Sequence, residues 1–307
     1  MMYRIVHSTT YQYNDNAEVC HNLVHLQPRN LPWQQCRQTQ LWIEPAPDGL
    51  HEYLDYFGNH VHSFAVYEPH LELSITAESY VTLTAREMVR LGETPAWNAV
   101  RDTLREDRAP EIVAAIEHRF DSPYIHTSGE LRELAADHFQ VDRPLGEAVL
   151  SLTQAIQRDF EYDPKATTID TSLDDVLEKR RGVCQDFAHL LIGCLRSLGL
   201  AGRYVSGYLR TDPQPGRLPL VGADASHAWV SVFCPGSGWI DFDPTNGCRT
   251  SDRHITVGWG RDFHDVSPVK GVVLGGGQST LQVAVDVLPV EPGGVTSPAK
   301  DQGAPTA

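Results

Sequence analysis

The stretch Gly182-Val183-Cys184-Gln185-Asp186 constrains the fold of this chain more than any other feature. A glycine turn here runs directly into an apolar stretch, about residues 185–198, that has the periodicity of a buried helix. Downstream the sequence becomes strand-like, with His227 opening one predicted strand and Asp243 ending the next. A thiol at a helix start, followed by an imidazole and a carboxylate on a hairpin, predicts an α+β fold with a Cys-His-Asp triad.

The position of Cys184 favours a reactive thiolate. A free thiol has a pKa of about 8.5, and the unpaired N–H groups and dipole of a helix N-terminus lower that pKa. The backbone N–H of Cys184 is also placed to stabilise an oxyanion. The alternative is that Cys184 is a small core residue that happens to precede a helix. We expect ordinary buried or surface thiols at the other cysteines, which are Cys20, Cys36, Cys194, Cys234 and Cys248.

His227 and Asp243 lie on the two strands of a predicted hairpin that turns near residues 235–238. A loop of three or five residues gives a register in which both side chains share one face, opposite or diagonal to each other. Such a pair is within reach of a hydrogen bond, whereas a four-residue loop would need a bulge. Asp241 shares that face and is the alternative third residue. The structural alternatives are a half-buried strand histidine and an aspartate that forms a turn before Pro244.

The rest of the chain divides by its residue pattern. Residues 1–85 are rich in Val, Ile, Thr and Tyr between turn sequences, which predicts a small β-sandwich-like domain. Helical periodicity then lasts from about residue 96 to about 200, and with the strands that follow it predicts a core domain over residues 86–288. Residues 289–307 are mostly Pro, Gly, Ala and Thr and are predicted to form a disordered tail.

Charge and composition exclude several classes of function. The formal net charge is −15 and no basic stripe is visible, so we expect no nucleic-acid partner. No apolar run approaches the roughly 20 residues that span a bilayer, and the first residues lack the features of a signal peptide. We therefore expect a cytoplasmic protein with no membrane contact. No Cys or His cluster has the spacing of a metal site, so we expect neither metal nor cofactor.

Four segments in this order resemble the bacterial transglutaminase-like superfamily: Gly182–Ala188, Leu195–Tyr208, Ser226–Val230 and Gly238–Asn246. Residues 1–85 also resemble the β-rich region that precedes this core in one bacterial branch. The resemblance implies a papain-like core, in which a helix carrying Cys packs on an antiparallel sheet carrying His and Asp. The acidic loops that hold calcium in animal members have no counterpart here.

Position by position, the resemblance implies Cys184 as the nucleophile, His227 as base and acid, and Asp243 as the residue that orients His227. The implied activity is cysteine-dependent acyl transfer on amide bonds of a peptide or protein, through a thioester intermediate. Release to water would make the protein a peptidase or amidase, and release to an amine a transglutaminase. Both outcomes stay open. The alternative from another class is a non-catalytic protein-binding module that retains the fold.

Further candidates are less specific. Gln185, Tyr162 and Trp229 are candidates for contact with the substrate or the oxyanion, with core packing as the alternative for the two aromatic residues. His189, one turn into the helix, is expected to be a hydrogen-bonded core or surface histidine. Arg261-Asp262-Phe263 together with Asp265 resembles another segment of the family, and we expect an ion pair there that braces the site.

Overall fold

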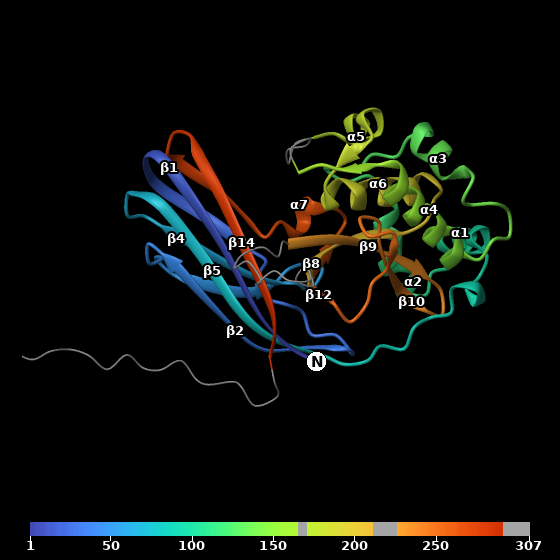
Figure 1. The fold of residues 1–307 in the computed structure, drawn as a ribbon, viewed down its shortest axis with the longest axis horizontal. Helices are drawn as coiled ribbons and strands as arrows, with labels where there is room; N and C mark the ends of the chain where they lie inside the picture. The colour runs from blue at the N-terminus through green and yellow to red at the C-terminus, as the bar shows by residue number, and fades with distance from the viewer. Residues whose placement is uncertain (165–170, 211–225, 291–307) are drawn as a thin grey trace, which may run out of the picture.

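The protein, seen here as a computed structural model, consists of a β domain and an α+β core. The structure describes residues 1–164, 171–210 and 226–290. Figure 1 shows the long strands of the β domain lying beside a core in which helices cover a second sheet. The predicted fold class is confirmed. Within the described residues, no helix is long and apolar enough to cross a membrane.

The core sheet has five antiparallel strands in the order β11-β10-β9-β8-β12. Their bounds are β8 Gly202–Leu209, β9 Ser226–Cys234, β10 Gly238–Asp243, β11 Cys248–Arg249 and β12 His254–Gly260. Helix α6, Cys184–Ser197, packs on β8 and β9 in the middle of this sheet. The helix that starts with the thiol therefore lies against β9, which pairs with β10, the strand whose last residue is Asp243.

The remaining helices surround α6. They are α1 Trp97–Glu106, α2 Pro110–Ile116, α3 Gly129–Ala136, α4 Leu145–Asp159, α5 Leu173–Lys179 and α7 Phe263–Val266, with 3₁₀ turns η1 Leu91–Glu93 and η2 Glu117–Arg119. Two short parallel strands, β6 Glu161–Tyr162 and β7 Arg181–Gly182, lead into α6. Arg180 ends α5 in the left-handed conformation with φ 52°.

The β domain is one sheet with β1 at its centre. Its strands are β1 Met2–Val24, β2 Gln34–Glu44, β3 Leu50–Leu54, β4 His60–Val66, β5 His70–Leu83, β13 Val269–Gly275 and β14 Ser279–Val290. The first half of β1 pairs with β5 and β14, and its second half pairs with β4 and β13. Every one of these pairings is antiparallel, so β1 is hydrogen-bonded on both edges.

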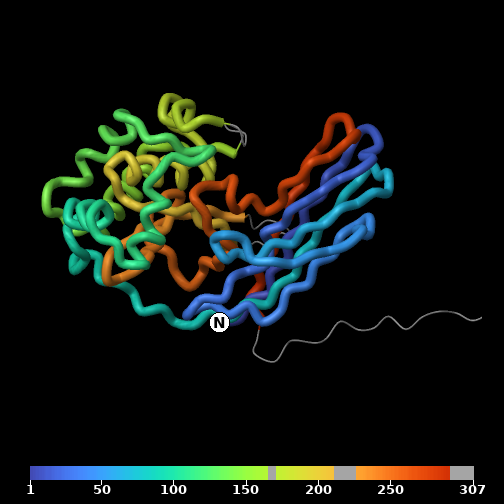
Figure 2. Tube along the Cα trace, turned by 180° about the vertical axis from the view of Figure 1, so that it is seen from behind, coloured from blue at the N-terminus to red at the C-terminus, as the bar shows by residue number. Residues whose placement is uncertain are grey.

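The sheet bends where the register of β1 is irregular, between residues 12 and 17 against β5 and between residues 17 and 19 against β13. Figure 2 shows the long strands turning over together at one end of the domain. The two halves face each other across one buried cluster, which includes Cys20, Val24, Phe64 and Val66 from one half and Ile43, Leu73, Ile75 and Ala77 from the other. The predicted sandwich-like domain is thus a single sheet folded over on itself.

The predicted boundary between the domains needs a correction at its C-terminal side. Residues 86–288 were expected to form the core, but β13 and β14 leave the core and complete the sheet of the β domain. Local residue patterns do not encode this pairing, because it joins strands from distant parts of the chain. Pro289 and Val290 end β14, and the rest of the predicted tail lies outside the described residues.

An apolar cluster joins the two domains. Its buried members are Tyr3, Ile5, Val81, Leu83, Val285 and Val287 from the β domain and Tyr208, Ile255 and Val257 from β8 and β12. A polar contact lies beside it, where the ring Nδ1 of His7 is 3.0 Å from the hydroxyl of Tyr208. Because this burial is continuous, the two domains are held together as in a domain core.

Gly207 allows the closest backbone approach in the core sheet. A Cβ at this position would overlap the carbonyl oxygen of Ile255 and the indole ring of Trp229. We predict that Gly207→Ala lowers the free energy of unfolding by about 1–3 kcal/mol, because a strand carbonyl cannot move aside as a flexible side chain can. The matched control is Gly129→Ala in α3, where an added Cβ meets no atom within 4 Å. Urea denaturation followed by tryptophan fluorescence measures both, and equal stabilities would contradict the packing described here.

Candidate active site

Cys184 is the first residue of α6, and the residues around it explain this placement. Asp186 accepts a hydrogen bond from the backbone N–H of Val183 at 2.8 Å, which caps the helix start. A Cβ at Gly182 would lie 2.8 Å from both Cβ and Oδ2 of Asp186. Glycine is therefore needed at position 182 for the cap to close over the start of the helix.

A cleft of about 290 Å³ opens at this helix start, with Cys184, Gln185 and His227 among its lining residues. The N–H groups of Cys184 and Gln185 belong to the first turn of α6, where the helix itself provides no acceptor. Two N–H donors and the positive end of the helix dipole thus lie beside the thiol. This arrangement can stabilise an oxyanion in the cleft.

The hairpin has the register that places His227 and Asp243 together. Cys234 pairs with Gly238 across a three-residue loop, and Phe242 pairs with Val230. In this register, His227 is diagonal to Asp243 on one face of the sheet. The ring Nε2 of His227 is 2.8 Å from Oδ2 of Asp243. The register predicted from an odd-length loop is confirmed.

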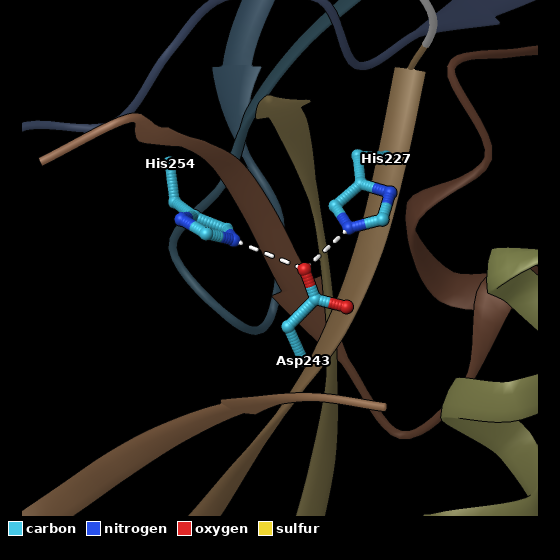
Figure 3. A group of neighbouring side chains, drawn as sticks. All are labelled: His227, Asp243 and His254. Atoms are coloured by element: carbon cyan, nitrogen blue, oxygen red, sulfur yellow. Dashed lines mark hydrogen bonds and ion pairs between the residues drawn. The ribbon is translucent and has the colours of Figure 1, made fainter. Parts of the chain in front are cut away.

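The carboxylate of Asp243 is fully buried and accepts five hydrogen bonds from the residues that the structure describes. Oδ1 accepts the backbone N–H groups of Thr245 at 3.0 Å and Asn246 at 3.1 Å. Oδ2 accepts from His227, from Nδ2 of Asn246 at 2.6 Å, and from Nε2 of His254 at 3.1 Å. Figure 3 shows the two imidazoles reaching Oδ2 from different sides. Burial alone raises the pKa of this carboxyl, but the hydrogen bonds outweigh it and hold the pKa of Asp243 well below its usual range.

His227 connects the carboxylate to the thiol. Burial of the ring lowers its pKa, but hydrogen bonds with Asp243 and with the side chain of Cys184 outweigh burial and raise the pKa of His227 to about 10. The ring is therefore positively charged at neutral pH. One imidazole thus contacts both the thiol and a buried carboxylate, which is the arrangement of a nucleophile, its base and the residue that orients the base.

Asp241, the alternative orienting residue, is engaged elsewhere. It accepts a hydrogen bond from Nη1 of Arg86 at 2.8 Å and another from the hydroxyl of Ser231. Its position on the same face as Asp243 is as expected, but its carboxylate neutralises an arginine instead of contacting His227.

His254 was missed in the sequence, although it contacts Asp243 directly. Its Nδ1 accepts the backbone N–H of Ser251 at 3.1 Å, so the proton of the neutral ring is on Nε2. The nearest polar atoms of His227, Asp243 and His254 lie within 4.8 Å of one another, as metal ligands would. A protonated Nε2 has no lone pair for a metal, however. The Nε2 of His254 therefore acts in this cluster as a hydrogen-bond donor to the carboxylate of Asp243.

The less specific candidates fall in different places. Gln185 lines the cleft. Tyr162 is 52% exposed, and burial, with a smaller contribution from nearby Cys184, raises the pKa of its phenol, so the phenol lies near the thiol. Trp229 does not line the cleft: it is 1% exposed and its ring packs edge-on against His254 at 5.3 Å. Core packing is therefore the role of Trp229, and its candidacy as a substrate contact was wrong.

The segment after β12 contacts α6 and lines the cleft through Phe263. Arg261 and Asp265 form the expected ion pair, with Nε 2.9 Å from Oδ2. The carboxylate of Asp262 is buried and accepts the backbone N–H of Tyr124 at 2.8 Å. His189 is buried as well, and its Nε2 accepts the backbone N–H of Phe263 at 3.2 Å, so it is a hydrogen-bonded core histidine.

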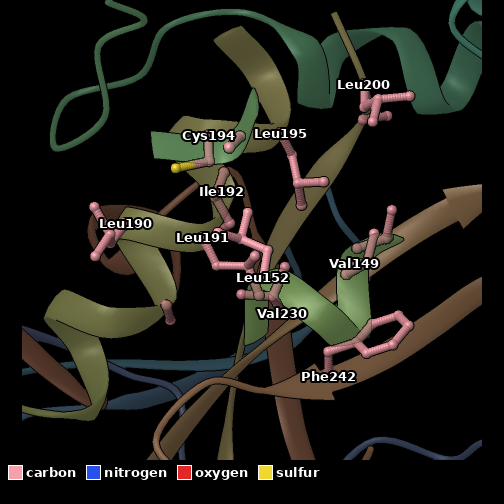
Figure 4. Packing of buried hydrophobic residues seen from close by; sticks show 14 of the residues in the cluster. Val149, Leu152, Leu190, Leu191, Ile192, Cys194, Leu195, Leu200, Val230 and Phe242 are labelled. Carbon is pink, nitrogen blue, oxygen red and sulfur yellow. The ribbon is translucent and has the colours of Figure 1, made fainter. Parts of the chain in front are cut away.

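Helix α6 is fixed because it is buried on all sides. Every residue from Asp186 to Ser197 is buried, which a helix surrounded by protein requires. Figure 4 shows its apolar side chains packed against α4 and the core sheet, with Val149, Leu152, Leu190, Leu191, Ile192, Cys194, Leu195, Leu200, Val230 and Phe242 labelled. Its buried Arg196 donates to the carbonyl oxygens of His118 and Gly202 at 3.0 and 3.1 Å.

The β domain supplies one wall of the cleft. His7, Thr9 and Tyr11 of β1 and Leu281 and Val283 of β14 all line it. Thr9 pairs with Val283 and Tyr11 with Leu281, so these side chains lie on one face of the sheet. Both apolar residues of β14 are about half exposed, at 47% and 50%. The cleft beside the thiol is therefore formed by both domains.

One helix and one antiparallel sheet thus bring a thiol, an imidazole and a carboxylate together in an α+β core. Residues 132–244 match the family model of the transglutaminase-like superfamily, and residues 3–82 match that of the bacterial transglutaminase-like N-terminal region. An uncharacterized protein of Mycobacterium tuberculosis strain H37Rv is 40% identical over 297 residues, which cover 94% of this chain and 93% of the relative. The chain belongs to the transglutaminase-like superfamily, as its four segments predicted.

Other similar proteins carry functional names. A protein-glutamine gamma-glutamyltransferase of Pseudomonas aeruginosa is 32% identical over 125 residues, which are 39% of this chain and 19% of that protein. A candidate cysteine protease from Cytophaga hutchinsonii has the same fold, with a TM-score of 0.72 at 22% identity, over 95% of this chain and 92% of that chain. The match to the core model ends at residue 244, before His254.

We predict that iodoacetamide at a pH of about 6 alkylates Cys184 before any other cysteine. An ordinary free thiol is almost fully protonated at this pH, and a protonated thiol is a poor nucleophile. Burial raises the pKa of each of the other five thiols, whereas Cys184 contacts the charged ring of His227. Peptide mass spectrometry after partial labelling identifies the modified residue. Faster labelling of Cys36 or Cys248, which are also partly exposed, would contradict the assignment of the nucleophile.

Proposed function

We propose that this protein is a cysteine-dependent enzyme that transfers acyl groups from amide bonds through a thioester. The observation that supports this most is the single imidazole of His227, which contacts the thiol of Cys184 on one side and the buried carboxylate of Asp243 on the other. A purely structural histidine would not need a buried carboxylate with five donors to keep it charged. Membership of the transglutaminase-like superfamily supports the same reaction class.

In the first half of the proposed reaction, the thiolate of Cys184 attacks the carbonyl carbon of an amide. The developing oxyanion is stabilised by first-turn N–H groups of α6. When the tetrahedral intermediate collapses, the C–N bond breaks and His227 gives its proton to the leaving amine. The products are a free amine and a thioester on Cys184, and His227 is left neutral.

The second half returns the enzyme to its starting state. Neutral His227 takes a proton from water or from a primary amine, which attacks the thioester carbon. The C–S bond breaks, the thiolate of Cys184 is restored, and the acyl group leaves as a carboxylic acid or as a new amide. Asp243 keeps the ring of His227 in one orientation throughout and stabilises its charged form.

The lining of the cleft supports a neutral substrate group. The described lining residues are apolar or uncharged apart from the catalytic pair, and they include Phe263, Val269, Leu281 and Val283. A side-chain carboxamide or a peptide bond flanked by apolar residues suits these walls better than a charged group, whose burial would be costly. We therefore propose a peptide or protein substrate that presents an uncharged amide.

The proposed activity is tested with a library of peptide amides, with and without a primary amine. We expect wild-type protein to produce cleaved, deamidated or amine-coupled peptides, each of which has its own mass. Cys184→Ala should abolish all of them, whereas Cys248→Ala, which removes another partly exposed thiol outside the cleft, should not. A Cys184→Ala variant that still turns over peptides would contradict the mechanism. A wild-type protein that binds peptides without converting them would favour the non-catalytic binding module.

We also predict that Asp243→Asn nearly abolishes turnover, whereas Asp241→Asn keeps most of it. The side-chain amide that Asp243→Asn introduces would place an N–H2 group against the donors that now contact Oδ2. The same substitution in a serine-protease triad costs about 10⁴-fold in kcat. The amide oxygen in Asp241→Asn can still accept a hydrogen bond from Arg86. Steady-state kinetics compare the two isosteric variants. An inactive Asp241→Asn variant together with an active Asp243→Asn variant would contradict the orienting role of Asp243.

The pH profile gives a second readout of the same pair. The pKa of His227 is raised from 6.5 to about 10, so the charged ring is favoured over that whole interval and is lost as the pH rises through about 10. In any residual activity of Asp243→Asn, the alkaline limb should move down toward the ordinary pKa of histidine, since the main hydrogen bond that raises it is gone. An alkaline limb unchanged from wild type would contradict this assignment.

A further inference from the structure

The mechanism so far does not use the second imidazole on Asp243. His254 is 8% exposed, and its Nε2 lies 3.1 Å from the same Oδ2 that accepts from His227. We propose that His254 is a positioning residue of the active site, whose neutral ring donates to Oδ2 of Asp243 and holds that carboxylate in the orientation that His227 needs. This inference rests on the proposed function, because it concerns the same pair.

The direction of the hydrogen bond follows from the turn before β12. The backbone N–H of Ser251 points at Nδ1 of His254, 3.1 Å away, and the backbone N–H of His254 in turn donates to the carbonyl oxygen of Ser251 at 3.2 Å. An Nδ1 that accepts a hydrogen bond carries no proton, so in the neutral ring the proton is on Nε2. That proton is donated to the carboxylate of Asp243, because this is the acceptor that Nε2 faces.

Two side chains other than His227 thus fix Oδ2 of Asp243. Asn246 follows Asp243 closely in the chain and moves with it, whereas His254 comes from β12, which β9 and β8 separate from β10 in the sheet. The ring of His254 is itself held edge-on against the indole of Trp229, at 5.3 Å between ring centroids. The hydrogen bond from His254 therefore fixes the carboxylate of Asp243 relative to β12, a strand outside the hairpin that carries Asp243.

The consequence for the reaction is specific. His254 lines a second cavity, behind the site, and is not among the residues that line the cleft with Cys184. Its loss should therefore affect the orientation of His227 and leave contacts with the substrate intact. A small misplacement of a catalytic group can lower kcat by up to about 100-fold. We expect such a decrease in kcat with an unchanged KM.

Three variants test the proposal. His254→Leu fills the space without a donor, and His254→Gln places an amide N–H near the position of the ring Nε2. His70→Leu is the matched control, because His70 is equally buried at 6% exposure but contacts the carbonyl of Glu68 in the β domain, away from the cleft. We expect a lower kcat in His254→Leu, a kcat close to that of the wild type in His254→Gln, and an unchanged kcat in His70→Leu. Thermal unfolding of all three variants identifies any variant that is inactive because it does not fold.

Two measurements that need no turnover separate this proposal from the proposed function. Nitrogen-15 NMR of labelled histidine should show His254 as the neutral tautomer with its proton on Nε2, and Asp243→Asn should alter that signal. The rate at which iodoacetamide labels Cys184 should fall in His254→Leu and recover in His254→Gln. A proton on Nδ1, or unchanged kcat and labelling in a folded His254→Leu, would overturn the proposal. If the labelling rates of the two His254 variants change as expected but the wild-type protein converts no amide, the proposed function alone would be overturned.

Discussion

The site depends on a carboxylate that is ionised although it has no contact with water. Removing a carboxylate from water is costly unless hydrogen bonds replace the lost hydration, and within the described part of the chain Asp243 accepts five of them. The donors come from β9, from the turn after β10 and from β12, so the charge can be buried only if these segments are in place together. Chemistry and folding are thereby linked at one residue: the arrangement that keeps Asp243 charged is also the one that orients His227.

The thiol side of the site is built by different means. Asp186 and Gly182 shape the start of α6 locally, and burial of the helix from Asp186 to Ser197 prevents it from tilting. The thiol thus comes from an element fixed by apolar packing, whereas the imidazole and carboxylate come from strands fixed by a polar network. The side chain of His227 contacts both the thiol and the carboxylate, which explains why its charge state reports on the whole site.

Sequence predicted what is encoded locally. The turn and cap at Gly182–Asp186 lie within a few residues, and the register of the hairpin follows from the length of its loop. Strand β3 could not be predicted, because all five of its residues are exposed and show no alternation. His254 lies outside any motif and reaches Asp243 across two intervening strands, so no spacing rule identifies it. The burial of Trp229 likewise depends on β12, a later strand, and not on its own neighbours in the sequence.

The central place of β1 has a consequence for the order of assembly. Its first half needs β14 on one edge, so that edge stays open until residues 279–290 have been synthesised. Pairings between distant segments form slowly, and an open strand edge can recruit another chain in the meantime. The core sheet and its helices have more local connections and can form first. The thiol is then in place before Leu281 and Val283 complete the wall of its cleft, so a ribosome-bound or prematurely terminated chain would carry that thiol open to solvent.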